Sequence, residues 1–372
     1  MALSKVDLAN MVENVAPAST IPDVNFRNII INGDMSIAQR GTSSTGISGN
    51  GYFSVDRFKH IISGLGTWTA SQSTDVPTGQ GFANSFKMDC TTADASPAAG
   101  DYNVLAQIVE GANVQHLKKG TSSAESITWS FWVKSNKTGT YICEILDGNN
   151  TRQISKSYTI SSSNTWEKKT ITMAGDTSGA IGTGASAFLQ FNFWLAVGSD
   201  RSSGTLNTSW NSTTNANRAV GQVNLADSTS NEWYITGVQL EAGTSASEFE
   251  FLPHDVNLQR CLRYYYVHAE GDQQHVGGSS GYYNNTYLTT SVIFPTQMRS
   301  APSLVKTSGT GYYTIYRDNS NDPFDDYNAG IQQPTKFAAG IDATTGVSGT
   351  AGQYGRVITT NASASIAFNS EL

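Results

Sequence analysis

The chain has 372 residues, of which only 14% are charged, and its formal net charge is −7 at pH 7. Soluble domains average about 25% charged residues. This chain, rich in Gly, Ser, Thr and Asn, therefore has the composition of turn-rich β-structure. Its negative charge, with no run of more than two Lys or Arg residues, argues against electrostatic binding to nucleic acid or to an anionic membrane.

The length predicts two domains, and the cysteines predict a reducing environment. Cys90, Cys143 and Cys261 are odd in number and widely spaced, which favours buried thiols over a disulfide framework or a metal site. The N-terminus lacks the apolar core of a signal peptide, and no stretch is long enough to cross a membrane. We therefore expect folding in the cytoplasm without membrane insertion.

Residues 1–25 are predicted to form a segment for attachment or oligomerisation, followed by a linker. Residues 3–15 fit one short amphipathic helix, and residues 16–22, with two prolines, fit a linker. Isolated helices of this length rarely persist in water. The helix therefore either docks on a partner or on copies of itself, or the segment is a frayed terminus.

Residues 26–252 are predicted to form a β-sandwich. The apolar run Asn28–Asn32 ends at Gly33, as expected of a buried strand. Gly, Ser, Thr and Pro turns then separate further strand candidates at the spacing of a sandwich. These candidates are residues 52–62, 66–71, 85–89, 104–110, 141–147, 152–160 and 166–173.

Two strands place tryptophan on the face opposite their apolar side chains. Trp132 lies on the polar side of the predicted strand 126–134, and the predicted strand 188–197 has amides and a second tryptophan there. The C–H groups of a sugar ring stack on an indole, and its hydroxyls need donors and acceptors. The candidate ligand-binding residues are Trp132, Gln190, Asn192 and Trp194. Alternatively, a loop or a neighbouring subunit covers this face, and the tryptophans are ordinary packing.

The segment from Trp233 to Leu252 is predicted to close the sandwich. Apolar residues change parity within the strand Trp233–Glu241, which a bulge at Thr236–Gly237 would absorb. A connecting helix is predicted within residues 253–268 and carries three successive tyrosines. Residues 269–372 are predicted to form a smaller β-rich domain, whose few aliphatic residues suggest that it associates with other copies.

Several short motifs resemble those of tail-fibre and receptor-binding virion proteins of tailed bacteriophages, which carry a jelly roll similar to carbohydrate-binding modules. The matching pieces occur in the same order as in that family. They are Asn28–Ser43, Ser54–Lys59, Gly237–Pro253, Cys261–Tyr266 and Phe294–Ser303. The resemblance implies an all-β chain: a jelly-roll sandwich, a smaller C-terminal β domain and a short N-terminal helical segment.

The same resemblance implies a structural protein of the virion that is not an enzyme. It implies a homo-oligomer, with the trimer as the form that the family favours, and contacts to other virion proteins through residues 1–25. It also implies attachment to host-surface glycans. The alternative is an architectural decoration or connector of the head or tail, in which the tryptophans pack against other virion proteins.

The sequence offers no catalytic or metal-binding motif. Five scattered histidines show no zinc spacing, and no nucleophile elbow is present. Sugar-binding jelly rolls often hold a structural calcium near their first and last strands, where Asp34, Asp56 and Glu241 supply oxygen atoms. Ser36 and Gly237 stand where those modules carry acids. We therefore expect neither a cofactor nor a metal, with calcium as the one weak candidate.

Overall fold

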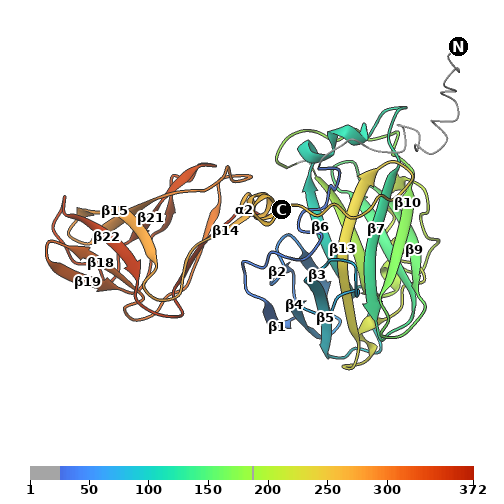
Figure 1. Ribbon diagram of the computed structural model, residues 1–372, viewed down its shortest axis with the longest axis horizontal. Helices are drawn as coiled ribbons and strands as arrows, with labels where there is room; N and C mark the ends of the chain where they lie inside the picture. Colours follow the sequence, from blue (N-terminus) through green and yellow to red (C-terminus); the bar gives the residue numbers. More distant parts are fainter. Residues whose placement is uncertain (1–25, 187) are drawn as a thin grey trace, which may run out of the picture.

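The computed structural model describes residues 26–186 and 188–372, which form two all-β lobes with helix α2 (His254–Leu262) between them (Figure 1). The larger lobe is a jelly-roll sandwich of two antiparallel sheets. One sheet contains, in order, β1 (Ser43–Ile47), β4 (Thr67–Ser73), β5 (Ser85–Thr92), β13 (Glu232–Ala242), β7 (Ile127–Ser135) and β10 (Glu167–Met173). The other contains β12 (Asn211–Ser212), β9 (Arg152–Ile160), β8 (Gly139–Asp147), β11 (Phe188–Val197), β6 (Tyr102–Glu110), β3 (Lys59–Ser63) and β2 (Gly51–Tyr52).

The smaller lobe also contains two sheets. A three-stranded sheet has the order β14 (Tyr265–Glu270), β23 (Ser365–Asn369) and β17 (Ser303–Lys306). A seven-stranded sheet has the order β19 (Ser320–Phe324), β18 (Tyr313–Arg317), β22 (Tyr354–Thr359), β15 (His275–Asn284), β16 (Tyr287–Ile293), β21 (Ala338–Ala343) and β20 (Gly330–Gln332). Short 3₁₀ helices occur in the sandwich lobe at Gly111–Leu117, Ser199–Arg201, Asn215–Asn217 and Leu225–Asp227.

Aromatic side chains fill the space between the two sheets of the sandwich. Period-2 alternation turns Trp129 and Phe131 of β7 inward, and Phe193 of β11 meets both of them. The ring centroids of Trp129 and Phe193 are 4.7 Å apart, and those of Phe131 and Phe193 are 5.0 Å apart. Such pairs add to the stability that burial of apolar area provides. The core therefore fixes which face of each strand points outward.

The predicted bulge in the closing strand is confirmed. The register of β13 against β7 shifts between Thr236 and Gln239. Gly237 has a φ of 61°, and an added Cβ would lie 2.5 Å from the Phe82 ring. Only glycine fits there without strain. The bulge keeps the apolar residues on both sides of it in the core: Trp233, Ile235, Val238 and Leu240.

Two predictions about local structure are wrong. The run Asn28–Asn32 is buried but irregular rather than a strand, because its N–H groups have mixed partners. The Ile31 N–H donates to Gln107 Oε1 (2.7 Å), the Ile30 N–H to Asn28 Oδ1 (3.0 Å) and the Ile29 N–H to the Leu240 carbonyl of β13 (2.9 Å). The helix ends at Leu262, so Tyr265 and Tyr266 lie in β14, where they pair with β23.

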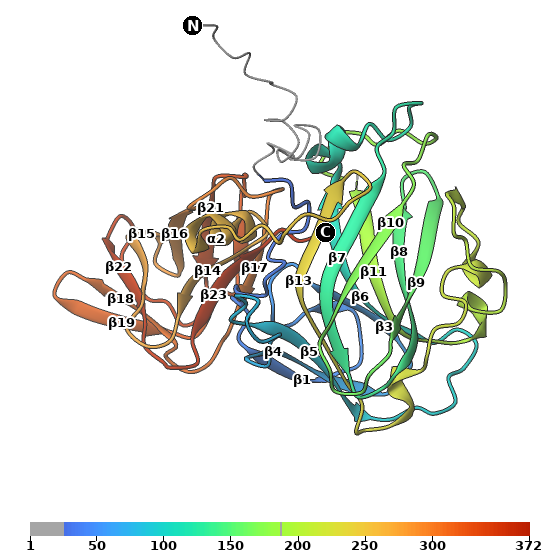
Figure 2. The ribbon, with the colours of Figure 1, turned by 45° about the vertical axis from the view of Figure 1, so that its right-hand side comes forward.

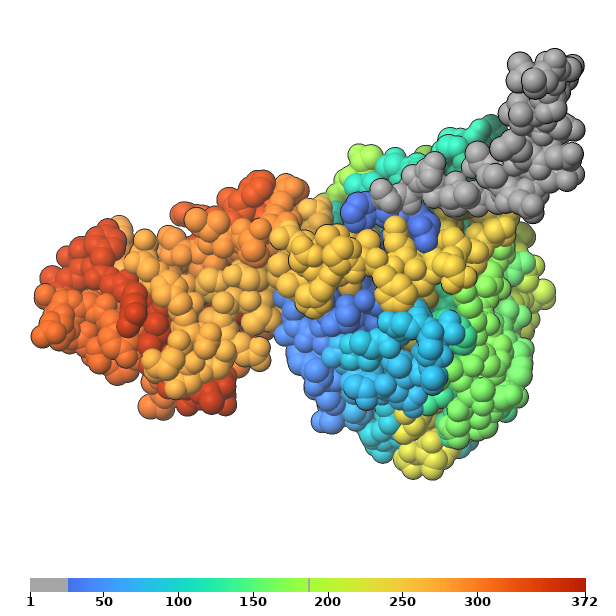
Figure 3. Space-filling view, in the orientation of Figure 1, coloured from blue at the N-terminus to red at the C-terminus, as the bar shows by residue number. Residues whose placement is uncertain are grey.

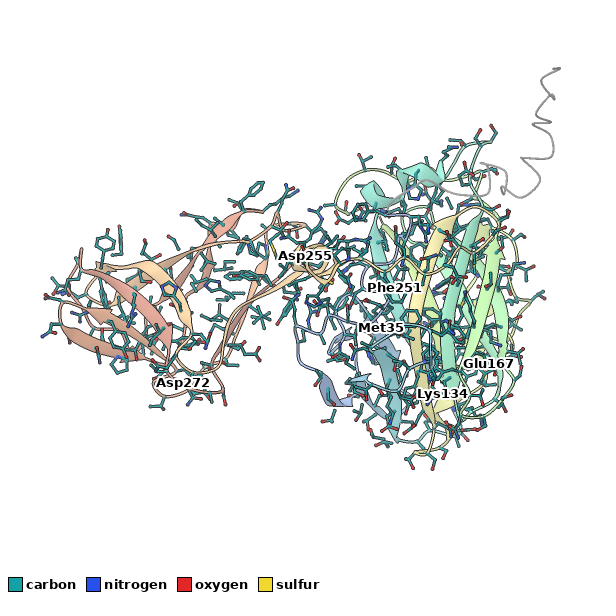
Figure 4. The ribbon with its side chains drawn as sticks, viewed as in Figure 1. Met35, Lys134, Glu167, Phe251, Asp255 and Asp272 are labelled. Atoms are coloured by element: carbon teal, nitrogen blue, oxygen red, sulfur yellow. The ribbon has the colours of Figure 1, made fainter. Side chains whose placement is uncertain are left out.

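The two lobes meet over a restricted area beside α2 (Figures 2 and 3). The Arg263 guanidinium, just after the helix, donates two hydrogen bonds of 2.8 Å to the Glu110 carboxylate of β6. Glu371 forms ion pairs with Arg57 and Arg40 of the sandwich. Figure 4 labels Asp255 in the first turn of α2, between the lobes. Charged contacts and a small apolar cluster of Ile31, Ile37, Cys261 and Tyr264 therefore connect the lobes, while each keeps its own large apolar core.

Burial also bears out the prediction for the cysteines. Cys90, Cys143 and Cys261 are free thiols, and all three are buried. Among the residues that the structure describes, no helix has the length and hydrophobicity needed to span a membrane. Residues 1–25, predicted to be an attachment segment, lie outside the described part of the chain.

Candidate functional site

The four residues predicted to bind a ligand do not form one surface. Trp132 belongs to β7 in the six-stranded sheet, whereas Gln190, Asn192 and Trp194 belong to β11 in the seven-stranded sheet. All four alternate with core residues, so they lie on the outward faces of two opposite sheets. Strand periodicity distinguishes inward from outward but does not say which sheet a strand joins. The prediction of a single face across both strands is therefore corrected.

The loop between β11 and β13, residues 198–231, covers the part of this face on β11. Trp194 is only 1% exposed. Its indole N–H donates to Glu144 Oε2 (3.2 Å), and Asn192 Nδ2 donates to the same oxygen (2.8 Å). Arg218, from the loop, donates to both Glu144 oxygens at 2.7 and 2.9 Å and lies over the Trp194 ring. Here the chain itself takes the place that was predicted for a ligand.

Trp132 is half-buried on the other sheet, opposite Lys168 and Thr236 of its neighbouring strands. The same face carries Lys134, whose ammonium lies 4.4 Å from the Tyr234 ring centroid. Figure 4 labels Lys134 on this sheet. A ligand role for Trp132 stays a prediction, separate from the three residues of β11.

A second surface, which sequence reasoning missed, is a groove of about 460 Å³ in the smaller lobe. It lies on the outward face of the seven-stranded sheet, over β15, β16, β21 and β20, three of which are labelled in Figure 2. Tyrosines, hydroxyls, amides and one carboxylate line it. The residues that matter for its chemistry are Tyr283, Tyr287, Thr289, Ser291, Gln332 and Asp342.

Small outward residues hollow this sheet. On β21 the outward positions are Ala338, Gly340 and Asp342, and Gly340 lies opposite Ser291 in the ladder. Because none of these side chains is large, β21 forms a low floor between its neighbouring strands, β16 and β20. Tyr283 sits at an irregularity of β15, between Tyr282 and Asn284, and is 77% exposed. Large rings therefore rise beside a floor of small residues.

The two tyrosines of the groove meet edge to face. The ring centroids of Tyr283 and Tyr287 are 5.9 Å apart, with an interplanar angle of 70°. The Tyr287 hydroxyl donates to Asp342 Oδ2 at 2.5 Å, and this hydrogen bond raises the pKa of Tyr287. An exposed aromatic surface thus stands directly beside a carboxylate.

Asp342 is the feature of the groove that most needs an explanation. The side chain is only 3% exposed, and its Oδ1 atom has no hydrogen-bond partner among the described residues. Leaving a buried polar atom without a partner costs about 1–3 kcal/mol, and more for a charged group. Buried polar groups in native proteins nearly always have partners, so an orphan in a groove wall suggests that a ligand supplies the missing donor.

The groove has the chemistry of a binding site. Tyrosine rings offer apolar surface for the C–H face of a sugar, and hydroxyls, amides and the carboxylate can pair with its hydroxyls. Glycoside hydrolysis by the usual route needs two carboxyl groups flanking the bond. Among the described residues that line the groove, Asp342 is the single carboxylate.

The oxygens considered for calcium are occupied in separate hydrogen bonds. Asp56 accepts from Gln39, Glu241 accepts from Ser247, and Asp34 accepts from Asn257. Within the described ranges, no group of three or more acidic, His or Cys side chains could hold a metal. The three carboxylates therefore do not fit a shared calcium site.

Comparisons with known proteins give distant similarities only. No family model matches the chain, and neither does any curated sequence. Among solved structures it is similar to the enzymatically active domain of bacteriophage CBA120 tailspike protein 4, with 14% identity, 58% of this chain and 21% of that chain covered, and a TM-score of 0.31. The chain thus spans about a fifth of that tailspike chain.

Two further solved structures are matched over nearly their whole length. One is a putative sugar-binding protein from Bacteroides thetaiotaomicron, with 12% identity, 58% of this chain and 99% of that chain covered, and a TM-score of 0.33. The other is a family 11 carbohydrate-binding module from Clostridium thermocellum in complex with a mixed-linked tetrasaccharide, with 10% identity, coverages of 55% and 98%, and a TM-score of 0.27. None of these matches assigns a ligand to this chain.

Proposed function

We propose that this protein is a structural component of a tailed bacteriophage virion that attaches to host-surface glycans. The smaller lobe holds the glycan in its tyrosine-lined groove, and the protein binds the glycan without cleaving it. The observation that carries the proposal is the buried Asp342 oxygen beside the Tyr283 and Tyr287 rings, which has no hydrogen-bond partner in the described part of the chain. The motifs that resemble tail-fibre proteins supply the biological setting.

The proposal includes assembly as a homotrimer, with residues 1–25 joining other virion proteins. Single glycan sites of this open kind bind weakly, and several copies on one particle raise the overall affinity. The sandwich lobe then acts as the rigid body that carries the groove, since its own loop seals the outward face of β11 at Trp194.

Removal of one tyrosine ring is expected to weaken glycan binding. A glycan array identifies the best oligosaccharide for the purified oligomer, and calorimetry then measures its Kd. Tyr283→Ala should raise this Kd about 10- to 30-fold, because a stacked ring contributes roughly 1.5–2 kcal/mol through buried area and aromatic contact.

Tyr316→Ala provides the matched control, since Tyr316 is a half-buried tyrosine on β18, away from the groove strands. Its Kd should stay within about twofold of the wild type. Equal Kd values for the wild type and Tyr283→Ala would remove the groove from the proposal. A matching loss in Trp132→Ala would move the site to the sandwich.

A second candidate function is architectural, and two exposed apolar side chains favour it. Ile293 is 80% exposed at the rim of the groove, and Phe337 is 60% exposed in the segment before β21. Exposed apolar clusters often mark protein interfaces. If the array shows no glycan binding and the groove is buried by a neighbouring protein in a map of the virion, this reading replaces attachment.

A further inference from the structure

The charges around the groove restrict which glycans it can hold. Of the described residues that line it, Asp342 alone carries a formal charge, and the others are aromatic, hydroxyl, amide or aliphatic. No lysine or arginine is among them, whereas binding sites for carboxylates and phosphates characteristically use Arg or Lys. The whole chain is also negative, with a net charge of −7.

The Asp342 Oδ1 atom lacks a hydrogen-bond donor among the described residues. A carboxylate accepts hydrogen bonds only. The Tyr287 hydroxyl already occupies Oδ2, while Oδ1 has no partner within residues 26–186 and 188–372. Oδ1 is closed to solvent, so a contact between a ligand hydroxyl and this carboxylate requires a local side-chain movement, which displacement of Tyr287 would provide. A sugar hydroxyl satisfies the need, whereas a second carboxylate would place like charges side by side in a partly dry site.

We propose that the groove selects uncharged sugars that present hydroxyl donors and excludes anionic sugars such as uronates, with Asp342 setting this selectivity. The inference rests on the proposed function, because it assumes that the groove is a glycan site.

The test compares one oligosaccharide in two charge states. The probes are the neutral oligosaccharide that binds best on the array and the same compound with its C6 primary alcohols oxidised to carboxylates. Calorimetry on the intact protein at low ionic strength should give a Kd at least about tenfold higher for the oxidised form. The ratio should shrink as salt is added, because salt screens partly exposed charges.

Two variants test whether groove residues cause the difference in Kd between the neutral and the oxidised oligosaccharide. Asp342→Asn keeps the side-chain shape and removes the charge, so the ratio of the two Kd values should fall to within about threefold. Gln332→Lys leaves Asp342 in place and adds a cation to the wall, and it should also lower the ratio. It serves as the independent variant if Asp342→Asn fails to fold.

The outcomes separate the two proposals. Equal or tighter binding of the oxidised oligosaccharide by the wild type would overturn the selectivity while leaving glycan binding intact. A ratio that neither Asp342→Asn nor Gln332→Lys changes would likewise remove Asp342 from its role. If neither form of any oligosaccharide binds, the proposed function fails, and the selectivity fails with it.

Discussion

Replacing Arg218 with Met is expected to lower the free energy of unfolding of the sandwich by about 3–5 kcal/mol. The Glu144 carboxylate beneath it is fully buried, and Arg218 donates to both of its oxygens. Without the guanidinium, a charge stays buried with the Asn192 amide and the Trp194 indole as its remaining donors among the described residues. Urea denaturation measures the loss, followed through tryptophan emission, because all seven tryptophans lie in residues 68–233.

Arg201→Met is the matched control for this prediction. Arg201 comes from the same loop and lies over the Tyr102 ring, but within the described part of the chain its guanidinium donates to the Gly100 carbonyl alone. Its loss should cost less than about 1 kcal/mol. The double variant Glu144→Gln/Arg218→Met should recover most of the stability, since it removes both charges. A loss below about 1 kcal/mol in Arg218→Met would show that the loop does not seal this face.

Acid is expected to destabilise the sandwich through His60, by about 3 kcal/mol between pH 7 and pH 4. His60 is fully buried beside Phe53 and Phe86, and among the residues that the structure describes neither ring nitrogen has a hydrogen-bond partner. Burial lowers the pKa of His60 to about 3 from its usual 6.5. Below pH 6.5 the His60 imidazole therefore takes up a proton in the unfolded chain but stays neutral in the folded one. The free energy of unfolding is highest above pH 6.5 and falls as the pH drops toward 3.

The His60→Leu variant isolates this effect from the titration of the carboxylates. Leucine keeps the volume and removes two unpartnered nitrogens, so at pH 7 the variant should be at least as stable as the wild type. Its loss of stability between pH 7 and pH 4 should be smaller by about 3 kcal/mol. His275 is an exposed position in the other lobe, so His275→Leu should show the same dependence of unfolding free energy on pH as the wild type. Equal losses of unfolding free energy between pH 7 and pH 4 in the wild type and in His60→Leu would contradict this prediction.

Periodicity predicted most strands because the core is built from alternating side chains. The range Arg152–Ile160 matches β9 residue for residue, and the parity change at Thr236–Gly237 proved to be a bulge. The failures arose where tertiary contacts override the local pattern. Side-chain acceptors and one carbonyl of β13 satisfy the N–H groups of Ile29, Ile30 and Ile31 in place of a strand ladder. Tyr265 and Tyr266 pair with a strand about 100 residues away.

The candidate site was harder to predict than the strands. Alternation shows that Trp132 and Trp194 point outward, but their sheets differ, and only the fold reveals that Arg218 lies over Trp194. The groove depends on the register of β16 and β21, whose residues are about 50 positions apart. The sequence signal for the groove was the alternation of Ala338, Gly340 and Asp342 on one face of a strand. This signal indicates a groove only once the fold places the tyrosines of β15 and β16 beside it.

One structure determination tests the account most directly: crystals of the protein soaked with the neutral oligosaccharide that binds best in solution. The account predicts density for a sugar ring against Tyr283, with a hydroxyl within hydrogen-bond distance of Asp342. Density on Trp132 of the sandwich, or an empty groove in crystals that leave it open, would contradict it.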